Sequence, residues 1–364
     1  MKNTFGQSVS FTLFGESHGE EIGIIIDGLA PGIKVDNDYI RLQLDRRRPS
    51  GRISTSRSEA DNFRIVSGVF NNRTTGTPIC ILIPNTNKKS GDYSKLAVLP
   101  RPGHADYTAM CKYHGFQDYR GGGHFSGRLT APLVAAGAIA RMALAEKGIY
   151  IGTHIKTLAG KSDRSFDTEN IKSDIDSLAK SNFPVLDEKS GAEMRVEAEK
   201  AASEGDSVGG ILETTVIGMP AGVGEPWFDT VESILSHALF SIPEVKGVEF
   251  GDGFALADMK GSTANDCFTT DGKSIATKTN HNGGINGGIT NGMPLLFRLV
   301  IKPTPSIFKE QDTVNLNTME NTKLQIEGRH DPTIVHRAAP VVDAVTAMVL
   351  CDLIAGRFGT DYLK

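Results

Sequence analysis

The sequence has few cysteines, few aromatic residues and no excess of positive charge. Its 364 residues include four cysteines and one tryptophan, and the formal net charge is -4. The scattered cysteines form neither a CxxC pair nor a disulfide-dense pattern, which favours a reducing compartment. The acidic balance excludes a global positive field that would attract nucleic acid or an acidic membrane surface, so any anion site must be local.

Long apolar runs are also missing. The N-terminal segment MKNTFGQSVSFTLFGESHGE has no extended apolar stretch and does not resemble a signal peptide. No apolar run reaches the ~18 residues that a membrane span needs. We therefore expect a cytoplasmic protein that binds neither membranes nor nucleic acid. No metal site is expected, because the His and Cys spacings of such sites are absent.

Hydrophobic periodicity predicts a mixture of strands and helices. Strands are expected at Ser8–Phe14, Glu21–Asp27, Phe63–Phe70, Pro78–Pro84, Gly210–Ile217, Val245–Phe250 and Met293–Lys302. Helices are expected at Asp36–Arg47, Leu129–Lys147, Thr230–Phe240 and Val341–Arg357. The two element types do not alternate in a strict βαβ order, which favours an α+β fold, a sandwich with mixed or antiparallel sheets. The chain is long enough to bury a sizeable core.

One polar stretch interrupts this pattern. Residues 162–205 are rich in Lys, Asp, Glu and Ser, and their best helical segment is Glu193–Ser203. We interpret the stretch as a peripheral excursion from a single large domain that spans residues 1–364.

The segment FGESHGE places Ser17 and His18 between two glycines, directly after an expected strand. Its spelling matches the GxSxG nucleophile elbow of serine hydrolases. An elbow must lead into a helix, however, whereas the residues that follow, EEIGIIIDG, have the pattern of a strand. A serine hydrolase is therefore disfavoured, and His18 is either a structural residue or part of a cleft.

Two further loops combine histidines with arginines or glycines. In RPGHADY, His104 is suited to general acid catalysis near neutral pH, although a structural role is equally compatible with the segment. In YRGGGHFSGR, glycine-rich backbone leads into an expected helix, where unpaired N–H groups and the helix dipole attract anions. Arg128 adds positive charge there. The alternative is a flexible turn followed by an N-cap.

The remaining candidate segments are also ambiguous when taken singly. The run Arg46–Arg48 and the nearby Arg52 form either a solvated face or a set of forks for carboxylates and phosphates. In GRHDP, Asp331 lies beside a cation and a base, or only caps a turn. The glycine-rich Asn280–Gly292 segment lets backbone approach a ligand, or simply makes turns. P-loop and Rossmann signatures fail at required glycines.

Taken together, these segments occur in an order and spacing that resemble those of the chorismate synthase family. The matching segments are FGESHG, DRRRPS, RPGHADYT, YRGGG, VKGVEFGDGF, NGGINGGITNG, KPTPS and GRHDP. The resemblance implies the β-α-β sandwich of that family. It also implies conversion of 5-enolpyruvylshikimate 3-phosphate to chorismate and phosphate by a 1,4-trans elimination, with reduced FMN and no net redox change. A non-catalytic phosphate-binding or nucleic-acid-binding module is the alternative.

The resemblance also implies roles for individual residues. His18 would protonate the leaving phosphate, His104 would protonate or stabilise the reduced flavin, and Asp331 would relay a proton from flavin N5. Substrate anions would be bound by Ser17, Arg47, Arg48, Arg52, Arg128 and Arg329. The flavin would contact His124, Phe125, Ser126, Pro243, Glu244, Gly287, Lys302, Pro303, Thr304, Pro305, Ser306 and Arg329.

Two positions depart from the family pattern. Phe125 stands where a serine hydroxyl is common near the flavin, and Glu244 stands where a small residue is common. Family members are typically homotetramers. FMN reduction by an external flavin reductase is expected, and NADPH would be needed only if the chain had an intrinsic flavin reductase activity.

Overall fold

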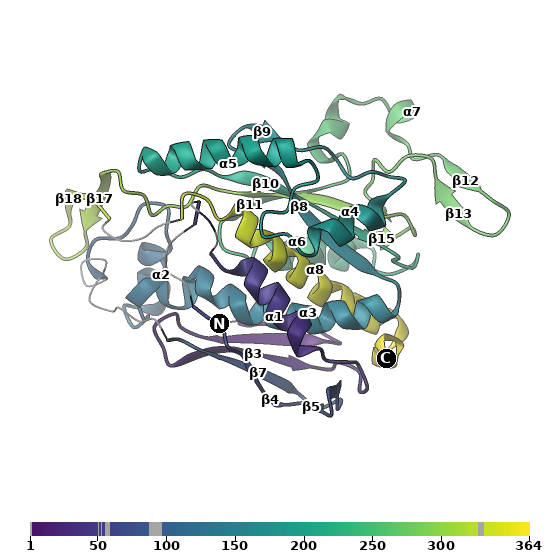
Figure 1. The fold of residues 1–364 in the computed structure, drawn as a ribbon, viewed down its shortest axis with the longest axis horizontal. Coiled ribbons are helices and arrows are strands. Elements are labelled where there is room, and N and C mark those ends of the chain that lie inside the picture. The colour runs from purple at the N-terminus through teal and green to yellow at the C-terminus, as the bar shows by residue number, and fades with distance from the viewer. Residues whose placement is uncertain (1, 50, 52, 55–58, 87–96, 327–330) are drawn as a thin grey trace.

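Two five-stranded sheets enclose a layer of helices in the computed structural model, which describes residues 2–49, 51, 53–54, 59–86, 97–326 and 331–364 (Figure 1). The first sheet has the strand order β1-β2-β3-β7-β4, and the second has the order β11-β16-β10-β8-β9. The neighbouring strands described within both sheets are antiparallel. This architecture confirms the predicted α+β sandwich.

The element boundaries follow the chain from the first sheet to the last helix. The first sheet consists of β1 (Thr4–Phe5), β2 (Ser10–Gly15), β3 (Glu21–Asp27), β7 (Ile79–Pro84) and β4 (Arg64–Ser67). The second consists of β11 (Val245–Phe250), β16 (Leu295–Ile301), β10 (Gly210–Ile217), β8 (Tyr150–Leu158) and β9 (Lys161–Ser162). Small ribbons are β5 (Val69–Phe70) with β6 (Arg73–Thr74), β12 (Phe268–Thr270) with β13 (Ile275–Thr277), β14 (Ile285–Asn286) with β15 (Ile289–Thr290), and β17 (Gln311–Asn315) with β18 (Glu320–Leu324).

The helices divide into an inner layer and an outer cover. The described helices are α1 (Asn37–Arg47), α2 (Asp106–Tyr113), α3 (Thr130–Glu146), α4 (Ile171–Leu178), α5 (Glu188–Ser203), α6 (Val231–Leu239), α7 (Gly261–Ala264) and α8 (Val335–Phe358). Helices α1, α3 and α8 lie between the two sheets, whereas α5 covers the outer side of the second sheet (Figure 1). Residues 162–205, the predicted polar excursion, include α4 and α5.

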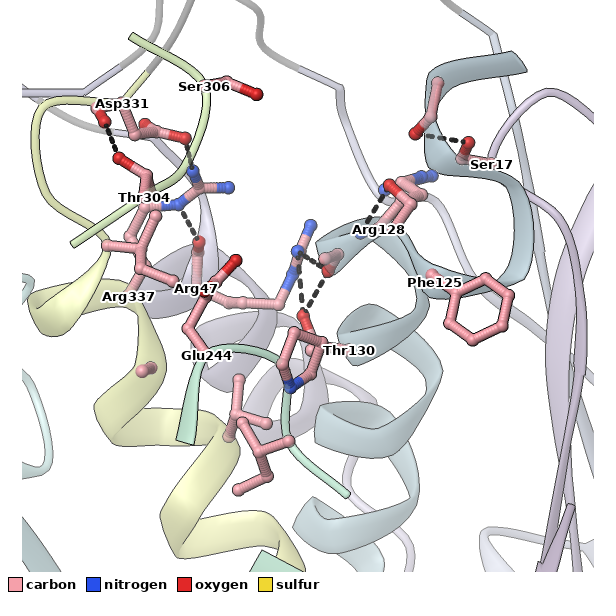
Figure 2. A pocket seen from close by; sticks show the side chains of 18 of the residues that line it. Ser17, Arg47, Phe125, Arg128, Thr130, Glu244, Thr304, Ser306, Asp331 and Arg337 are labelled. Atoms are coloured by element: carbon pink, nitrogen blue, oxygen red, sulfur yellow. Dashed lines mark hydrogen bonds and ion pairs between the residues drawn. The ribbon is translucent and has the colours of Figure 1, made fainter. Parts of the chain in front are cut away.

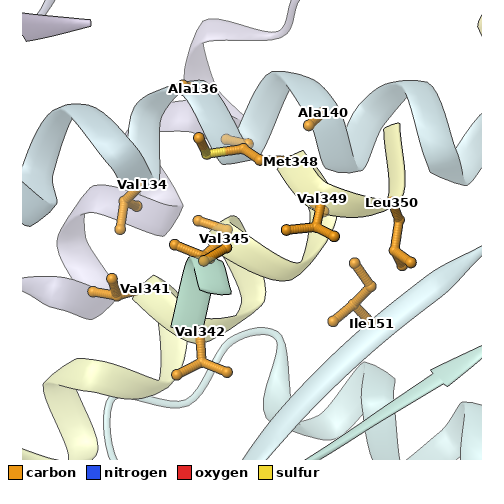
Figure 3. Close-up of a cluster of buried hydrophobic side chains, with 14 of the residues drawn as sticks. Val134, Ala136, Ala140, Ile151, Val341, Val342, Val345, Met348, Val349 and Leu350 are labelled. Carbon is orange, nitrogen blue, oxygen red and sulfur yellow. The ribbon is translucent and has the colours of Figure 1, made fainter. Parts of the chain in front are cut away.

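Helices α3 and α8 form the centre of the core (Figure 3). Gly137 of α3 faces Ala344 of α8 so closely that a Cβ at position 137 would overlap Ala344. One turn further on, the Cys351 thiol lies 3.6 Å from the Ala140 carbonyl. From the first contact to the second, the residue numbers rise on both helices. Helices α3 and α8 therefore run roughly parallel and begin at the same end of the molecule.

Both core helices have the length and apolar composition of a membrane span. Helix α8 has 24 residues, which differs from our expectation that no segment is long and apolar enough. Nearly all of α8 is buried between the sheets, and α3 is mostly buried too. Their apolar character is therefore explained by core packing.

Three predicted boundaries were wrong for identifiable reasons. The expected strand Phe63–Phe70 is divided into β4 and β5 at Gly68, whose φ of +80° turns the chain and whose missing Cβ allows contact with Ile79. Helix α8 begins at Val335 rather than Val341, because it continues through Pro340 despite the lost N–H group. Helix α5 begins at Glu188, where the Asp187 side chain accepts a hydrogen bond from Ser190 N.

One central strand was not predicted at all. Strand β8 lies between β10 and β9 and is buried along most of its length. Its sequence, YIGTHIKTL, contains polar residues on the buried faces. The Thr153 hydroxyl pairs with that of Thr214 at 2.9 Å, and His154 lies between Asp163 and Glu213 at 2.9 and 3.1 Å. These buried polar contacts replace the apolar alternation that identifies a strand.

The close approach of α3 and α8 predicts a stability loss for Gly137→Ala. The added methyl group overlaps Ala344, so the helices must separate, and overpacking of this kind costs about 1–3 kcal/mol of unfolding free energy. Gly356→Ala in α8 is a matched control, because its Cβ would lie 3.6 Å from Ser8 Oγ in ordinary contact. Urea denaturation should show a lower midpoint for Gly137→Ala alone, and equal midpoints for the two variants would contradict the packing argument.

Candidate functional site

A cavity of about 310 Å³ opens where the core helices begin. Helix α3 contributes its N-terminal turn and α8 contributes Arg337, while the end of α1 contributes Arg47. The loops after α6 and β16 complete the wall. The lining residues are Ser17, Arg47, Arg48, Pro49, Glu59, Arg101, His104, Gly121, Phe125, Ser126, Gly127, Arg128, Thr130, Ile242, Pro243, Glu244, Thr304, Pro305, Ser306, Asp331, Ile334, Arg337, Ala338 and Val341.

The positive ends of two helix dipoles lie at this cavity, because α3 and α8 both begin there. Figure 2 shows Asp331 and Arg337 on one side, Ser17 and Arg128 on the other, and Arg47 between them. Arginines and helix N-termini both stabilise bound anions. The cavity thus brings several arginines together in a protein whose net charge is negative.

Asp61 neutralises two of these arginines from behind the cavity. Its carboxylate lies 2.8 Å from Arg47 Nη2 and accepts a short contact from Arg128 Nη1. Burial opposes ionisation of Asp61, but the charges of Arg47 and Arg128 outweigh burial and lower the pKa of its carboxyl. Burial lowers the pKa of Arg47, and Asp61 counteracts that effect. A guanidinium remains charged under such conditions.

Arg47 retains unsatisfied donor capacity. Its Nη1 donates to the Thr130 hydroxyl at 3.2 Å, yet its buried Nε has no hydrogen-bond partner among the residues that the structure describes. A buried guanidinium nitrogen without an acceptor is costly. Arg47 itself lines the cavity, so its positive charge is placed where it attracts an anion.

Asn85 connects Arg128 to the FGESHG loop. Its carbonyl oxygen accepts from Arg128 Nε at 3.0 Å, and its amide donates to the carbonyls of Glu16 and Gly19 at 3.0 and 3.1 Å. The loop is followed by β3, a strand, as expected, so it is no nucleophile elbow. The Ser17 hydroxyl lies 3.1 Å from the carbonyls of Arg120 and Gly121.

The triple-glycine turn separates the two candidate histidines. Gly121, with φ of +60°, packs against the His18 ring so tightly that a Cβ would overlap it. A Cβ on Gly122, which has φ of +83°, would lie 3.3 Å from His104 Nε2. Only glycine fits both positions, because each needs a left-handed backbone and no side chain. The two histidines consequently pack against consecutive glycines of one peptide segment.

His104 lies in a charged cluster at the start of α2. Its Nδ1 is 2.7 Å from Asp106 Oδ1, and Arg101 binds the same carboxylate through Nε and Nη2, each at 2.8 Å. Burial opposes ionisation of Asp106, but hydrogen bonds from Arg101 and His104 outweigh it and hold the pKa of this carboxyl well below its usual range.

Asp331 is held by the first turn of α8. Its carboxylate accepts from Arg337 Nη1 at 2.7 Å, and Arg337 Nε donates to the Arg47 carbonyl at 2.9 Å (Figure 2). The Thr304 hydroxyl donates to the Asp331 backbone carbonyl at 2.7 Å. These contacts link α1, α8 and the loop after β16 around the cavity.

Glu244 and Lys302 form an ion pair at the cavity wall, with 3.0 Å between Oε2 and Nζ. Lys302 Nζ also donates to the Gly103 carbonyl at 2.7 Å, which ties the RPGH loop to β16. Glu244 has φ of +72°, a conformation that is strained for a side chain. The pair neutralises the charge of Lys302.

Most predicted site residues that the structure describes line the cavity. They are Ser17, Arg47, Arg48, His104, Phe125, Ser126, Arg128, Pro243, Glu244, Thr304, Pro305, Ser306 and Asp331. His18, Lys302 and Pro303 lie next to lining residues but do not line it themselves. Arg52 and Arg329 lie outside the described residues.

Two predicted flavin contacts are not brought to the cavity wall. The His124 ring nitrogen Nδ1 donates to the Gly15 carbonyl at 2.8 Å. Gly287 lies in the β14–β15 turn, and the carbonyl of the next residue, Gly288, accepts from Val231 at the start of α6. Pro243, which lines the cavity, follows the other end of α6. The nine residues of α6 span about 13 Å, so Gly287 and Pro243 lie near opposite ends of this helix.

Sequence reasoning missed several charged residues of the site. Arg101 and Asp106 belong to a segment that the motif had identified, but only its histidine was given a role. Arg337 follows Asp331 by six residues, and it could have been recognised as a further cation beside GRHDP. No local signal distinguishes Asp61, because its two partners are distant in the sequence.

Comparisons with known proteins agree on one family. The family model described as chorismate synthase matches residues 9–355. The chorismate synthase of Thermococcus gammatolerans is 48% identical over 347 residues, covering 95% of this chain and 96% of that relative. That of Dehalococcoides mccartyi is 47% identical over 354 residues, covering 97% and 96%. A chorismate synthase crystal structure superposes with a TM-score of 0.77 at 28% identity, covering 97% of this chain and 94% of that one.

The buried position of Asp61 predicts a large stability loss for Asp61→Asn. The substitution leaves Arg47 and Arg128 without their shared carboxylate, and breaking a buried pair costs about 3–5 kcal/mol of unfolding free energy. Asp312→Asn is the control, since its ion pair with Lys323 is largely exposed and is worth little. Similar urea midpoints for the two variants would contradict the role of Asp61.

The burial of His336, beside Arg337 on α8, predicts that the folded protein loses stability in acid. Burial, followed by the charges of Arg337 and Arg195, lowers the pKa of His336 to about 3, below the 6.5 of a free histidine. The unfolded chain therefore binds an extra proton between these values, so the His336 contribution is intact above pH 6.5 and declines as the pH falls toward 3.

Between pH 7 and pH 5 this decline amounts to about 2 kcal/mol of unfolding free energy. His336→Gln cannot titrate, so its stability should fall less than that of the wild type over the same interval. Parallel stability curves from urea denaturation at both pH values would refute the assignment.

Proposed function

Because the chain belongs to the chorismate synthase family, we propose that its cavity binds an enolpyruvyl shikimate phosphate and reduced FMN side by side. The chain is a carbon–oxygen lyase that converts 5-enolpyruvylshikimate 3-phosphate to chorismate and phosphate by a 1,4-trans elimination. This is the last common step in the biosynthesis of aromatic compounds by the shikimate pathway.

The group of arginines that line the cavity is the observation that carries the substrate proposal. The substrate has a phosphate and two carboxylates, and Arg47, Arg48 and Arg128 line the cavity beside two helix N-termini. Asp61 holds Arg47 and Arg128 in place without reaching the ligand itself. Prepositioned guanidinium groups reduce the entropy lost on binding, and they favour a multiply charged anion over a neutral molecule.

The cavity also fits a phosphorylated flavin by the chemistry of its donors. Hydroxyl groups of Ser126, Thr304 and Ser306 line it together with the apolar side chains of Phe125 and Ile242. Such a combination suits an aromatic ring system that carries hydrogen-bonding edges. When bound, reduced FMN supplies electron density transiently to the elimination.

The chain's own residues manage the protons of the reaction. We assign His18 the protonation of the leaving phosphate, because it is adjacent to Ser17, which lines the cavity. His104, across the Gly121–Gly122 segment, holds a proton on the flavin side. Asp331, kept beside the cavity by Arg337, would relay a proton from flavin N5.

The assembly and compartment follow the family in our proposal. Large apolar side chains at Trp227, Phe228, Phe254 and Phe268 are exposed, which is unusual for a monomer and supports a homotetramer. The free cysteines support a cytoplasmic location. An external flavin reductase would supply reduced FMN.

Anaerobic turnover of the enolpyruvyl substrate tests the proposal through phosphate release. Reduced FMN should support turnover, whereas oxidised FMN, alone or with NADPH, should not. Equal turnover without flavin would refute the cofactor assignment, and turnover with NADPH and oxidised FMN would refute the need for an external reductase.

Variants of the two histidines test their roles in the same assay. His18→Ala and His104→Ala should each lower kcat on the order of 100-fold or more, because each removes a proton donor. His114→Asn is the control, as His114 is exposed and its left-handed backbone suits asparagine. Near-normal kcat in either alanine variant would exclude the acid role of that histidine.

A further inference from the structure

We propose that Arg337 is a further substrate-binding residue, whose Nη2 binds a carboxylate of the substrate on the side of the cavity opposite Ser17. The inference rests on the proposed function, because it concerns the same cavity and the same substrate. The motif analysis gave Arg337 no role. Its contact with Asp331 accounts for only part of its hydrogen-bonding capacity.

Two acceptors fix the Arg337 guanidinium group. Nη1 donates to Asp331 Oδ2 at 2.7 Å, and Nε donates to the Arg47 carbonyl at 2.9 Å. One acceptor precedes α8 and the other belongs to the end of α1, so the group cannot rotate without losing a hydrogen bond. Arg337 is therefore prepositioned, which reduces the entropy lost when a ligand binds.

The third nitrogen of the group is left for a ligand. Nη2 donates to no residue that the structure describes, and it is not sealed from solvent. The Arg337 side chain is 16% exposed and lines the cavity. Figure 2 shows the guanidinium group between Asp331 and the main chain of Arg47, with its remaining nitrogen directed toward the open centre of the cavity.

Positive charge from two further sources favours an anion at this position. Arg337 lies in the first turn of α8, where the helix dipole attracts anions. Burial lowers the pKa of Arg47, Asp61 opposes that effect, and the nearby charge of Arg337 lowers the pKa further. Arg47 and Arg337 therefore repel each other, and an anion bound between two such cations stabilises both.

The carboxylates of the protein do not complete the site by themselves. Asp331 balances the charge of Arg337 through Nη1, and Asp61 balances Arg47 from behind the cavity. The attraction for a ligand therefore depends on the N–H groups of Nη2 and on the helix terminus rather than on an excess of unpaired arginines. A hydrogen bond from a guanidinium group to a carboxylate is about twice as strong as one between neutral groups.

The place of Arg337 in the cavity selects a carboxylate rather than the phosphate. The proposed function assigns the leaving phosphate to His18, next to Ser17. Arg337 lies beside Asp331 on the opposite side (Figure 2). The substrate has one carboxylate on its ring and one on its enolpyruvyl group, and both have the chemistry that Nη2 binds.

A purely structural role for Arg337 is the competing explanation. In that case the side chain only joins Asp331 to the end of α1 and keeps the cavity wall in place. Loss of a structural contact weakens every ligand of the cavity, whatever its functional groups. Loss of a direct contact weakens only the ligands that carry the carboxylate, so the experiment must compare ligands.

Calorimetric titration in the presence of oxidised FMN measures substrate binding without turnover. Arg337→Gln removes a charge-assisted hydrogen bond and should raise the Kd of 5-enolpyruvylshikimate 3-phosphate about 10-fold to 100-fold. Chorismate keeps both carboxylates but lacks the phosphate, so its affinity should fall by a similar factor. Inorganic phosphate, measured by competition with the substrate, should keep its affinity.

Shikimate 3-phosphate distinguishes the two carboxylates, because it has the ring carboxylate but no enolpyruvyl group. A loss of affinity equal to that of the substrate assigns Arg337 to the ring carboxylate. Unchanged affinity for shikimate 3-phosphate assigns Arg337 to the enolpyruvyl carboxylate.

Two further variants complete the comparison. Arg337→Lys keeps a cation beside Asp331 but lacks the third nitrogen, so it should weaken the same ligands, and it decides the question if Arg337→Gln does not fold. Arg357→Gln is the matched control, because Arg357 lies in the last turn of the same helix and donates to the Gly222 carbonyl away from the cavity. It should bind every ligand as the wild type does.

The outcomes separate this inference from the proposed function. An unchanged Kd for chorismate in the Arg337 variants overturns the inference, as does an equal loss of affinity for chorismate and inorganic phosphate. Wild-type protein that binds chorismate but releases no phosphate with reduced FMN refutes the proposed function, and the ligand comparison still decides the role of Arg337. Wild-type protein that binds none of these ligands refutes both.

Discussion

The parallel packing of α3 against α8 is the constraint on which the rest of the structure depends. Contact at Gly137 and Ala344 brings the helix axes close together between the two sheets, so both helices begin at the same end of the sandwich. Arg128 precedes α3 and Arg337 lies in the first turn of α8, and both line the cavity. The anion site therefore exists because the core is packed in this way.

Neighbouring arginines on α1 show how the fold distributes charge. Arg46 faces the core, where Asp343 of α8 lies 3.2 Å away and also binds Arg141 of α3. Arg47 faces the cavity and is balanced by Asp61. Burial makes each cation costly unless it is paired. The first pair joins the three inner helices, and the second keeps a charged guanidinium at the cavity wall.

The predictable parts of the fold were those with local signals. Helices α1, α3 and α6 and strands β3, β7 and β10 were recognised close to their true limits, because apolar spacing and caps are properties of the segment itself. Strand β8 was missed because its buried threonines and His154 are satisfied by partners on β10 and beyond. Helix α8 was shortened because its proline is tolerated within a fully buried helix.

The site residues also divide into those with a local signal in the sequence and those without one. The histidines, Asp331 and the arginines of α1 stand in compact motifs, so a single sequence was sufficient to name them. Asp61 acts through partners 14 and 67 residues away in the sequence, and nothing near it reports those contacts. Arg101 and Asp106 were within a recognised motif, but their contacts with His104 are visible only in the coordinates.

The glycines between the two histidines have a consequence for precision. His18 packs against Gly121 and His104 packs against Gly122, the next residue of the same stretch of main chain. Each ring therefore packs against main chain rather than against a flexible side chain, so no change of a neighbouring rotamer can open a gap there. A side chain introduced at either glycine would push directly on a proton-handling group.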